Sequence, residues 1–367
     1  MKLSAVPVIY YHSVKFKRIE FWVHPYITML LRDFSRHIKL LSLLKVKTFF
    51  MDDLYYHLKG ERKLPINSVI LNFDDGYLDN FVFAFPLLKK YKLKATIWVN
   101  PDFVDDNDTQ IHPTLEDYWQ GKVTLEELNK LDGFLNWEEM RLMEKSGFVD
   151  IQSHTMTHAK YPTSEKILDF VSPETKIDWL HWNLFPESKP KFFTNERKKI
   201  PLGYPIYESE KGNIAIKCEE TGEISKELAS YVNQKGGESF FENSDWKQEL
   251  FSLANSLKSK FQDCYRRESF EQYIFRLRKE LVDSKIIIEE KLNKKVNHVC
   301  WPFGGWNEHT EKLALESGYL TTTIRGEKNI FNKIKYYRAD RIALDNPKYQ
   351  NILFYPYAIY KIYGYKF

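Results

Sequence analysis

The amino-acid sequence predicts an α/β fold in which parallel strands and helices alternate to form a (β/α) barrel. Short apolar runs rich in β-branched and aromatic residues recur along the chain, and segments with helical spacing separate them. One strand, helix and strand follow one another within about 30 residues, the length of a βαβ unit, which implies a parallel sheet. A composition of 43% hydrophobic and 28% charged residues indicates a globular chain and excludes a disordered or collagenous one.

The first half of the chain contains the clearest elements. Strands are expected at residues 6–11, 49–51, 68–73, 94–100 and 148–152. Helices are expected at residues 30–44, 52–58 and 80–91, where apolar side chains share one face. A further helix begins after Asn136, because Asn136 is a good N-cap, Glu139 completes a capping box and Gly147 ends the segment.

The last third of the chain returns to the same alternation. A long helix is expected at residues 270–288, then a strand at 296–301, a helix at 309–317 and a strand at 319–324. Between residues 161 and 268 the alternation stops, and a polar stretch holds a hairpin-like segment at 213–224 and a helix at 245–257. We therefore expect a first part of the barrel (1–160), an inserted subdomain or cap (161–268), a second part of the barrel (269–345) and an aromatic tail (346–367).

Charge and cysteine content exclude some functions. The net charge of +4, from 54 basic and 50 acidic residues, is too balanced to require a nucleic-acid partner. Three cysteines without a CxxC pattern indicate neither a disulfide framework nor a thiolate zinc site. The first residues lack a signal-peptide pattern, and no run of about 20 apolar residues occurs, so a cytoplasmic protein is expected. The aromatic tail is compatible with a membrane surface, although packing on the barrel is the favoured interpretation.

Two adjacent carboxylates, Asp74 and Asp75, follow the strand at residues 68–73, with Gly76 after them. In a parallel α/β fold, the carboxyl ends of the strands face the active site. Two carboxylates in one site need a positive group nearby, or one of them will be protonated. The alternative is that they cap the following helix while Gly76 makes the turn.

Two histidines, His154 and His158, follow the strand at residues 148–152. At positions i and i+4 of a helical turn, both imidazoles would face the same way and could hold one divalent metal. Taken alone, they could equally be an exposed pair. Together with one aspartate they would form a facial triad with open coordination positions, leaving the other aspartate as a general base. Two further polar strand ends, at His12 and at residues 300–306, make a catalytic site the better interpretation.

Three segments resemble the polysaccharide deacetylase family, the NodB-homology carbohydrate N-deacetylases (carbohydrate esterase family 4). They are VILNFDDGY (69–77), DIQSHTMTH (150–158) and WPFGGWN (301–307). VIYYHSV near the N-terminus and ALESGYLTTTI near the C-terminus resemble the branch that acts on poly-N-acetylglucosamine. The resemblance covers roughly residues 5–160 and 270–345. It implies a distorted seven-stranded NodB-type barrel with a large insertion between the second and third motifs.

The resemblance implies a role for each motif residue. Asp74 would be the catalytic base, and Asp75, His154 and His158 would hold a divalent metal, zinc before Co, Ni, Mn or Fe. His12 would be the general acid, unless it is a strand-end histidine bonded to a backbone carbonyl. The third motif would supply an oxyanion donor near Phe303 and rings for the sugar, unless those rings pack in the core; its residues are Trp301, Pro302, Phe303 and Trp306.

The sequence departs from the family at two positions. Many members carry an arginine two residues before the proline of the third motif, where it orients the base, and here Cys300 stands there. Arg325 or Arg341 could substitute. The late Leu-x-x-His motif is also absent, since no histidine follows His309. That absence fits the branch whose acid lies on the first strand, and it would also fit an impaired enzyme.

The expected function is metal-dependent hydrolysis of the acetamide of an N-acetylated amino sugar, in the synthesis or modification of surface polysaccharide. The substrate would be a polymer or a lipid-linked or nucleotide-linked sugar, and a cytoplasmic enzyme would favour a precursor. Two alternatives stay open: a catalytically impaired carbohydrate-binding protein of the same fold, and a metal hydrolase acting on another non-peptide amide.

Overall fold

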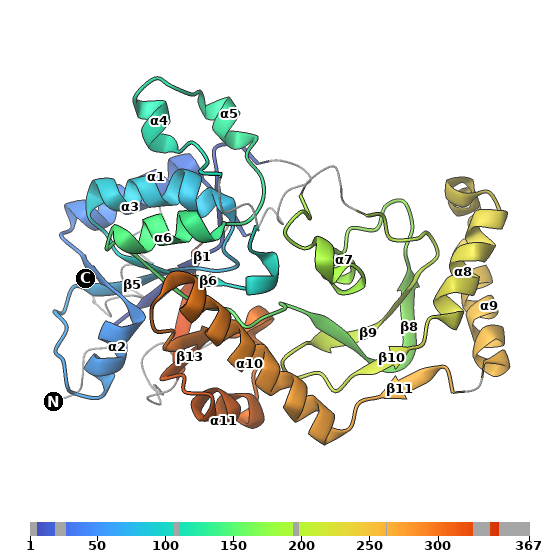
Figure 1. Cartoon of the computed structure of the whole chain (residues 1–367). Coiled ribbons are helices and arrows are strands. Elements are labelled where there is room, and N and C mark those ends of the chain that lie inside the picture. The colour runs from blue at the N-terminus through green and yellow to red at the C-terminus, as the bar shows by residue number, and fades with distance from the viewer. Residues whose placement is uncertain are drawn as a thin grey trace, which may run out of the picture.

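A closed parallel barrel forms the body of the protein (Figure 1). The computed structural model describes residues 6–18, 27–105, 110–193, 198–261, 263–325 and 338–344. Within these ranges seven strands close the ring in the spatial order β1 (Val8–Tyr11), β14 (Arg338–Ala343), β13 (Thr321–Arg325), β12 (His298–Cys300), β7 (Val149–Ser153), β6 (Ala95–Val99) and β5 (Ser68–Phe73). Pairing of β1 with both β14 and β5 completes the closure. The predicted seven-stranded (β/α) barrel is confirmed.

Helices cover the outside of the barrel (Figure 1). The main ones are α1 (Leu31–Leu43), α2 (Met51–Leu58), α3 (Phe85–Tyr91), α6 (Trp137–Lys145), α10 (Phe270–Leu292) and α11 (Glu308–Glu316). The predicted capping box of Asn136 and Glu139 is present at the start of α6. A π-helical turn, Asn80–Ala84, precedes α3 and lies beside Pro86, which has no N–H to donate. None of the helices in the described ranges is long and apolar enough to cross a membrane.

The barrel strands are buried on both faces, as their nearly continuous apolar runs predict. Along the barrel strands, alternate side chains belong to two different hydrophobic clusters. Ile70 of β5 and Trp98 of β6 belong to a smaller cluster, together with Cys300. Val69 and Leu71 belong to the main cluster, which includes side chains of the covering helices. The short strand β4 (Lys47–Phe49) pairs with β5 outside the closed ring.

The chain between the second and third motifs forms a lobe beside the barrel (Figure 1). Antiparallel strands β8 (Lys160–Phe170) and β9 (Pro205–Lys211) lead into it, and α7 (Asp178–Leu184) lies next to them. Helices α8 (Glu223–Gln234) and α9 (Trp246–Lys260) pack together farther out. The lobe has its own hydrophobic cluster, which includes Phe170, Leu228 and Leu250. It therefore adds a second core rather than extending the first.

The predicted hairpin at residues 213–224 is wrong, whereas the predicted helix at 245–257 is confirmed as part of α9. Strand β10 (Cys218–Glu220) pairs instead with β11 (Tyr265–Arg267), far along the chain. The Glu220 carboxylate accepts hydrogen bonds from the N–H groups of Gly222 and Ile224, and α8 begins there. Strand pairing depends on a partner that a local pattern does not contain. The predicted aromatic tail, residues 346–367, lies outside the described residues.

Helix α10 anchors the lobe to the barrel. Arg276 donates hydrogen bonds to the carbonyl oxygens of Gly212 (2.8 Å) and Ala215 (2.7 Å). The Tyr273 hydroxyl donates to the carbonyl oxygen of Asn213 at 2.8 Å. The segment that follows β9 is thereby fixed to the same helix that covers the barrel.

Replacement of Gly76 tests the turn that follows β5. Gly76 has a φ of +65°, and an added Cβ would lie 2.9 Å from Val99 Cγ1. We expect Gly76→Ala to lower the free energy of unfolding by about 1–2 kcal/mol for the left-handed backbone and by about 1–3 kcal/mol more for overpacking. Gly121→Ala is the matched control, because Gly121 has a φ of +74° and open space around its Cβ position. Equal losses in denaturant unfolding of the two variants would contradict the close packing at Gly76.

Candidate active site

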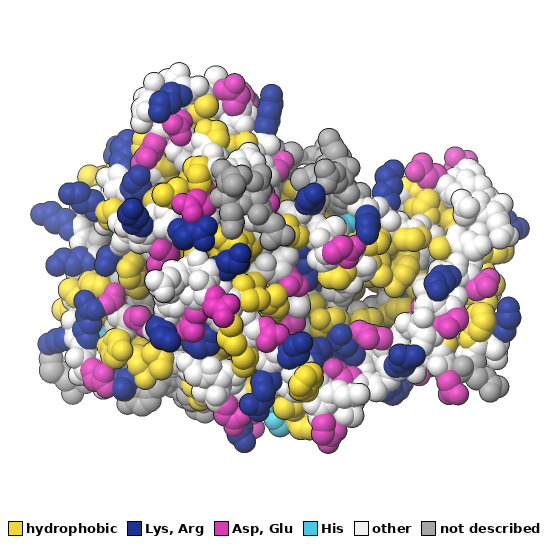
Figure 2. All heavy atoms as spheres, in the orientation of Figure 1, with side chains coloured by type: hydrophobic (Ala, Val, Ile, Leu, Met, Phe, Trp, Pro, Cys, Tyr) yellow, Lys and Arg dark blue, Asp and Glu magenta, His cyan; other side chains and the backbone are white. Residues whose placement is uncertain are grey.

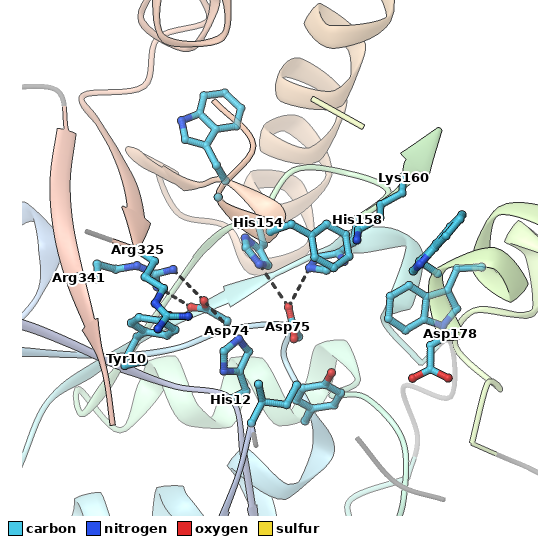
Figure 3. A pocket seen from close by; sticks show the side chains of 18 of the residues that line it. Tyr10, His12, Asp74, Asp75, His154, His158, Lys160, Asp178, Arg325 and Arg341 are labelled. Atoms are coloured by element: carbon cyan, nitrogen blue, oxygen red, sulfur yellow. Dashed lines mark hydrogen bonds and ion pairs between the residues drawn. The ribbon is translucent and has the colours of Figure 1, made fainter. Parts of the chain in front are cut away.

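A cavity of about 650 Å³ lies where the carboxyl ends of the barrel strands meet (Figure 3). The strand ends that the sequence predicts to converge do so here. His12 follows β1, Asp74 and Asp75 follow β5, and His154 and His158 follow β7, all in the cavity wall. The lobe completes the wall with side chains that include Lys160, Lys176 and Trp179.

Asp75, His154 and His158 point toward one another in Figure 3. Asp75 Oδ1 lies 3.2 Å from the Nε2 atoms of both histidines. His154 Nδ1 is bonded to the carbonyl oxygen of Cys300 at 2.8 Å, which leaves the Nε2 lone pair of a neutral ring directed at Asp75. Among the described residues, Asp75 Oδ1 is buried without a hydrogen-bond partner. One carboxylate and two imidazoles with these free atoms fit a divalent metal.

The electrostatics of Asp75 agree with an ionised ligand. Burial alone would raise the pKa of this carboxyl. The neighbouring His158 and His154 outweigh burial and hold the pKa of Asp75 well below its usual range. The acidic partner that a cation requires is therefore available over the whole physiological pH range.

The two histidines converge from a loop, so the prediction of a helical turn is wrong. Residues 154–158 are not helical, and both Thr155 (φ 62°) and His158 (φ 49°) have left-handed backbone. The imidazole centroids are 5.1 Å apart. Left-handed backbone is disfavoured for L-residues and persists where surrounding contacts impose it. The spacing of the histidines was therefore informative about the pair, but not about its local structure.

Two buried charged residues impose the loop conformation. Glu280 of α10 accepts hydrogen bonds from the N–H groups of Met156 and Thr157, both at 3.0 Å, and from Thr157 Oγ1 at 2.6 Å. Lys189 of the lobe donates to the carbonyl oxygen of Thr157 and to Asp102, both at 2.9 Å. Sequence reasoning missed both residues. Glu280 had one detectable signal, because it is an acidic residue within the apolar stripe of a long helix.

Asp74 is held by Arg341 in a buried bidentate ion pair (Figure 3). Arg341 donates from Nη1 to Oδ1 at 2.6 Å and from Nη2 to Oδ2 at 2.8 Å. Burial would raise the pKa of Asp74, but the adjacent guanidinium lowers it below its ordinary value. Arg341 Nη2 also contacts Cys300 Sγ at 2.9 Å. Of the two arginines that could substitute for the one expected at position 300, Arg341 is therefore the one that contacts Asp74.

Asp74, His154 and Cys300 also lie close enough together to be considered as metal ligands. Arg341 argues against that set, because its guanidinium occupies both Asp74 oxygens and contacts the Cys300 sulfur. A second cation there would be repelled at short range. The set of Asp75, His154 and His158 is the better metal site.

His12 lies near both carboxylates in Figure 3. Its Nε2 atom is 3.8 Å from Asp74 Oδ2, and the side chain is 17% exposed. The ring is packed edge-on against Tyr10, with centroids 5.5 Å apart. The position allows contact with a substrate in the cavity, as a proton donor requires.

The third motif divides between core and cavity. Trp301 is only 1% exposed and belongs to the main hydrophobic cluster, although it also borders the cavity, and Pro302 is buried as well. Trp306 packs against the Arg338 guanidinium at 4.1 Å. Phe303 is 39% exposed in the cavity wall, and its ring lies 4.3 Å from that of His158. Its backbone is left-handed (φ 53°). Of these three aromatic rings, the geometry favours Phe303 for contact with a sugar.

Comparison with known proteins finds a family match over part of the chain. Residues 61–183 match the family model for polysaccharide deacetylase. These residues, about a third of the chain, are thus similar to a polysaccharide deacetylase domain. The inferred polysaccharide deacetylase YxkH of Bacillus subtilis (strain 168) is 31% identical over 98 residues, which are 27% of this chain and 33% of YxkH. The matched region thus spans about a third of that relative.

Solved structures of similar fold cover most of this chain. The de-N-acetylase from Aggregatibacter actinomycetemcomitans has a TM-score of 0.56 and 20% identity, over 92% of this chain and 94% of that one. The BpsB deacetylase domain from Bordetella bronchiseptica has a TM-score of 0.51 and 16% identity, over 92% and 96%. At these identities the likeness shows the fold. The matched family is one of hydrolases of carbon–nitrogen bonds other than peptide bonds, which is the enzyme class predicted from the sequence.

We name residues 154–158, which carry the two candidate histidine ligands, the metal loop. Replacement of Glu280 tests whether its buried carboxylate positions this loop. We expect Glu280→Gln to weaken zinc binding by about 10- to 100-fold, because supporting residues of this kind orient the ligands. Isothermal titration with zinc measures the change. Glu290→Gln is the control, since Glu290 is an exposed residue of the same helix. Unchanged zinc affinity in a folded Glu280→Gln protein would show that the loop keeps its geometry without this carboxylate.

Proposed function

We propose that this polysaccharide deacetylase is a metal-dependent N-deacetylase that hydrolyses the acetamide of an N-acetylated amino sugar. One observation carries the proposal: a free aspartate–histidine–histidine set and an arginine-held aspartate face the same cavity. The first set can hold a metal, and the second carboxylate is kept ionised beside it. Amide hydrolysis needs both an electrophile for the carbonyl and a base for the water.

The proposed chemistry assigns one task to each residue of this chain. A divalent metal held by Asp75, His154 and His158 would polarise the carbonyl and lower the pKa of water toward about 7. Asp74 accepts the proton of the attacking water, and Arg341 orients its carboxylate. His12, in its protonated form, donates a proton to the leaving amine nitrogen. The Phe303 N–H is the proposed oxyanion donor, and such a donor is typically worth about 2.7–4 kcal/mol.

Zinc is the proposed metal, with Co, Ni, Mn or Fe as alternatives. Two imidazoles and one carboxylate are ligands that zinc accepts in catalytic sites, where a position is left open for water and substrate. The proposed substrates are polymeric, lipid-linked or nucleotide-linked N-acetylated sugars of surface polysaccharide. The exposed face of Phe303 would pack against the C–H face of the sugar.

The structure weakens the alternative of an impaired carbohydrate-binding protein. Cys300 raised that alternative because it replaces an expected arginine, but Arg341 holds the base instead. The missing late histidine was the second reason, and His12 lies in the cavity 3.8 Å from Asp74. The described residues therefore include a candidate for the group that orients the base, Arg341, and a candidate for the general acid, His12.

Acetate release from N-acetylglucosamine oligomers, with zinc added, tests the proposed function. We expect Asp75→Asn to lose zinc binding and turnover together. Asp74→Asn should keep zinc bound but lose turnover by about 10²–10⁴-fold, the usual contribution of a general base. His112→Asn is a control, because His112 pairs with Glu139 and is not part of the cavity wall. Absence of acetate from every acetamido sugar tried, with zinc shown to be bound, would refute the proposal.

The pH dependence of turnover tests the ion pair of Asp74 and Arg341. Because Arg341 lowers the pKa of Asp74, the base stays ionised, and its stabilising effect persists, until the pH falls through that lowered value. In Arg341→Met only burial remains, so the pKa of Asp74 rises. We expect the acidic limb of kcat to move up by about one to three pH units, and the fold to lose about 3–5 kcal/mol.

Arg338→Met is the matched control for this experiment, because Arg338 is on the same strand but packs on Trp306. Arg341→Lys keeps one positive charge, so the acidic limb of its kcat should lie between those of the wild type and Arg341→Met. Circular dichroism at each pH confirms that the variants are folded. An unchanged acidic limb in folded Arg341→Met would show that Asp74 does not control it.

A further inference from the structure

The charged side chains of the cavity wall do not balance. Among the residues of that wall that the structure describes, four are cationic and three are anionic: Lys160, Lys176, Arg325 and Arg341, against Asp74, Asp75 and Asp178. Both oxygens of Asp74 are bound by Arg341, and Asp75 is the proposed metal ligand. A bound divalent metal would add further positive charge. The face of the molecule seen in Figure 2, by contrast, mixes basic and acidic side chains.

Lys160 is the most constrained of these cations. It is the first residue of β8, directly after the metal loop, and it is half-buried beside His158 (Figure 3). Its Nζ atom lies 4.7 Å from the ring centroid of Phe303 and 5.8 Å from that of Trp179. No carboxylate forms an ion pair with it in the part of the chain that the structure describes.

The position of Lys160 orders its side chain against two aromatic rings. A lysine side chain normally extends into water, and ordering it costs about 1.5–2 kcal/mol of rotamer entropy. Contact with the two rings stabilises the cation but leaves its hydrogen-bond donors unused. Three ammonium donors thus remain for a group that enters the cavity.

Arg325 is a second cation without an ion pair to any described residue. It is the last residue of β13, is exposed, and lies on the side of the cavity where Arg341 holds Asp74 (Figure 3). Lys160 and Arg325 therefore stand on opposite sides of the proposed metal site. The two walls that a bound sugar would contact both carry positive charge.

We propose that the cavity selects an acetamido sugar bearing a negative charge, and that Lys160 binds the anionic group. This inference rests on the proposed deacetylase function and names its substrate class. The group is a carboxylate or a phosphate on the sugar or its immediate neighbour, since an ammonium acts as a point charge and accepts either. An uncharged homopolymer of N-acetylglucosamine would leave Lys160 and Arg325 without partners.

Competition between matched substrates tests the inference. Three oligomers of equal length are compared: uncharged N-acetylglucosamine, one with a carboxylate-bearing sugar, and one with a phosphate-bearing sugar. We expect kcat/KM for at least one anionic oligomer to exceed that of the uncharged one by about ten-fold or more, as a charged hydrogen bond would provide. Whichever anionic oligomer is preferred identifies the group.

Substitution of Lys160 assigns the preference to this residue. Lys160→Met should remove the preference for the anionic oligomer, lowering kcat/KM for that oligomer by a larger factor than kcat/KM for the uncharged one. Lys160→Arg, which keeps the charge, should retain most of the preference. Lys166→Met is the matched control, because Lys166 is an exposed residue of the same strand and pairs with Glu208 outside the cavity. A wild-type enzyme that prefers the uncharged oligomer, or a Lys160→Met variant that slows all oligomers equally, would overturn the inference.

Failure of the inference is distinguishable from failure of the proposed function. Turnover of uncharged oligomers without any preference would leave the deacetylase function intact and overturn only the charge selection. If no oligomer released acetate, the proposed function would fail. Calorimetric binding of the same oligomers to the wild-type protein and to Lys160→Met would then still decide whether Lys160 binds an anion.

Discussion

The buried ion pair between Arg341 and Asp74 is the interaction on which the site depends. It joins the last described strand of the barrel to the end of β5, two segments separated by most of the chain. Removing two charges from water costs several kcal/mol per ion, so a buried pair is weak evidence for stability. Here the bidentate geometry supports function instead. It fixes the orientation of the proposed base and keeps it ionised, and it can form only when β1 closes the ring by pairing with both β14 and β5.

The metal loop illustrates how a disfavoured backbone is maintained. Thr155 and His158 both adopt left-handed conformations, and the loop has no regular hydrogen-bond pattern to support them. Glu280 from α10 and Lys189 from the lobe satisfy the polar groups at its centre, and Asn100 donates to carbonyl oxygens at its start. Because these supports come from three different parts of the chain, the imidazoles are positioned by tertiary structure rather than by their own sequence.

How much of the structure the sequence predicts depends on how far apart along the chain the interacting residues lie. Strand β5 has the predicted bounds, since an apolar run followed by Asp74 and Asp75 is a local signal. The convergence of strand ends followed from the parallel barrel alone. The sequence could name Arg341 and Arg325 only as alternatives for the missing arginine, because the choice depends on which side chain reaches Asp74. Glu280 and Lys189 act through contacts more than 30 residues distant, and no motif marks them. The failed hairpin has the same cause, since its partner strand β11 is remote.

The lobe would link the proposed metal binding to the proposed selection of substrate. Lys160 begins its first strand immediately after the metal loop, and Lys189 reaches back from the lobe to the carbonyl of Thr157 in that loop. The lobe therefore cannot act as an independent cap, because displacing it would release the support of His158 and withdraw the cation beside it. Its attachment through Arg276 and Tyr273 to α10, the helix that also carries Glu280, joins both supports of the loop to one rigid element. A substrate that pairs with Lys160 would thus bind to the same framework that positions the metal ligands, and charge recognition and catalysis would share one geometry.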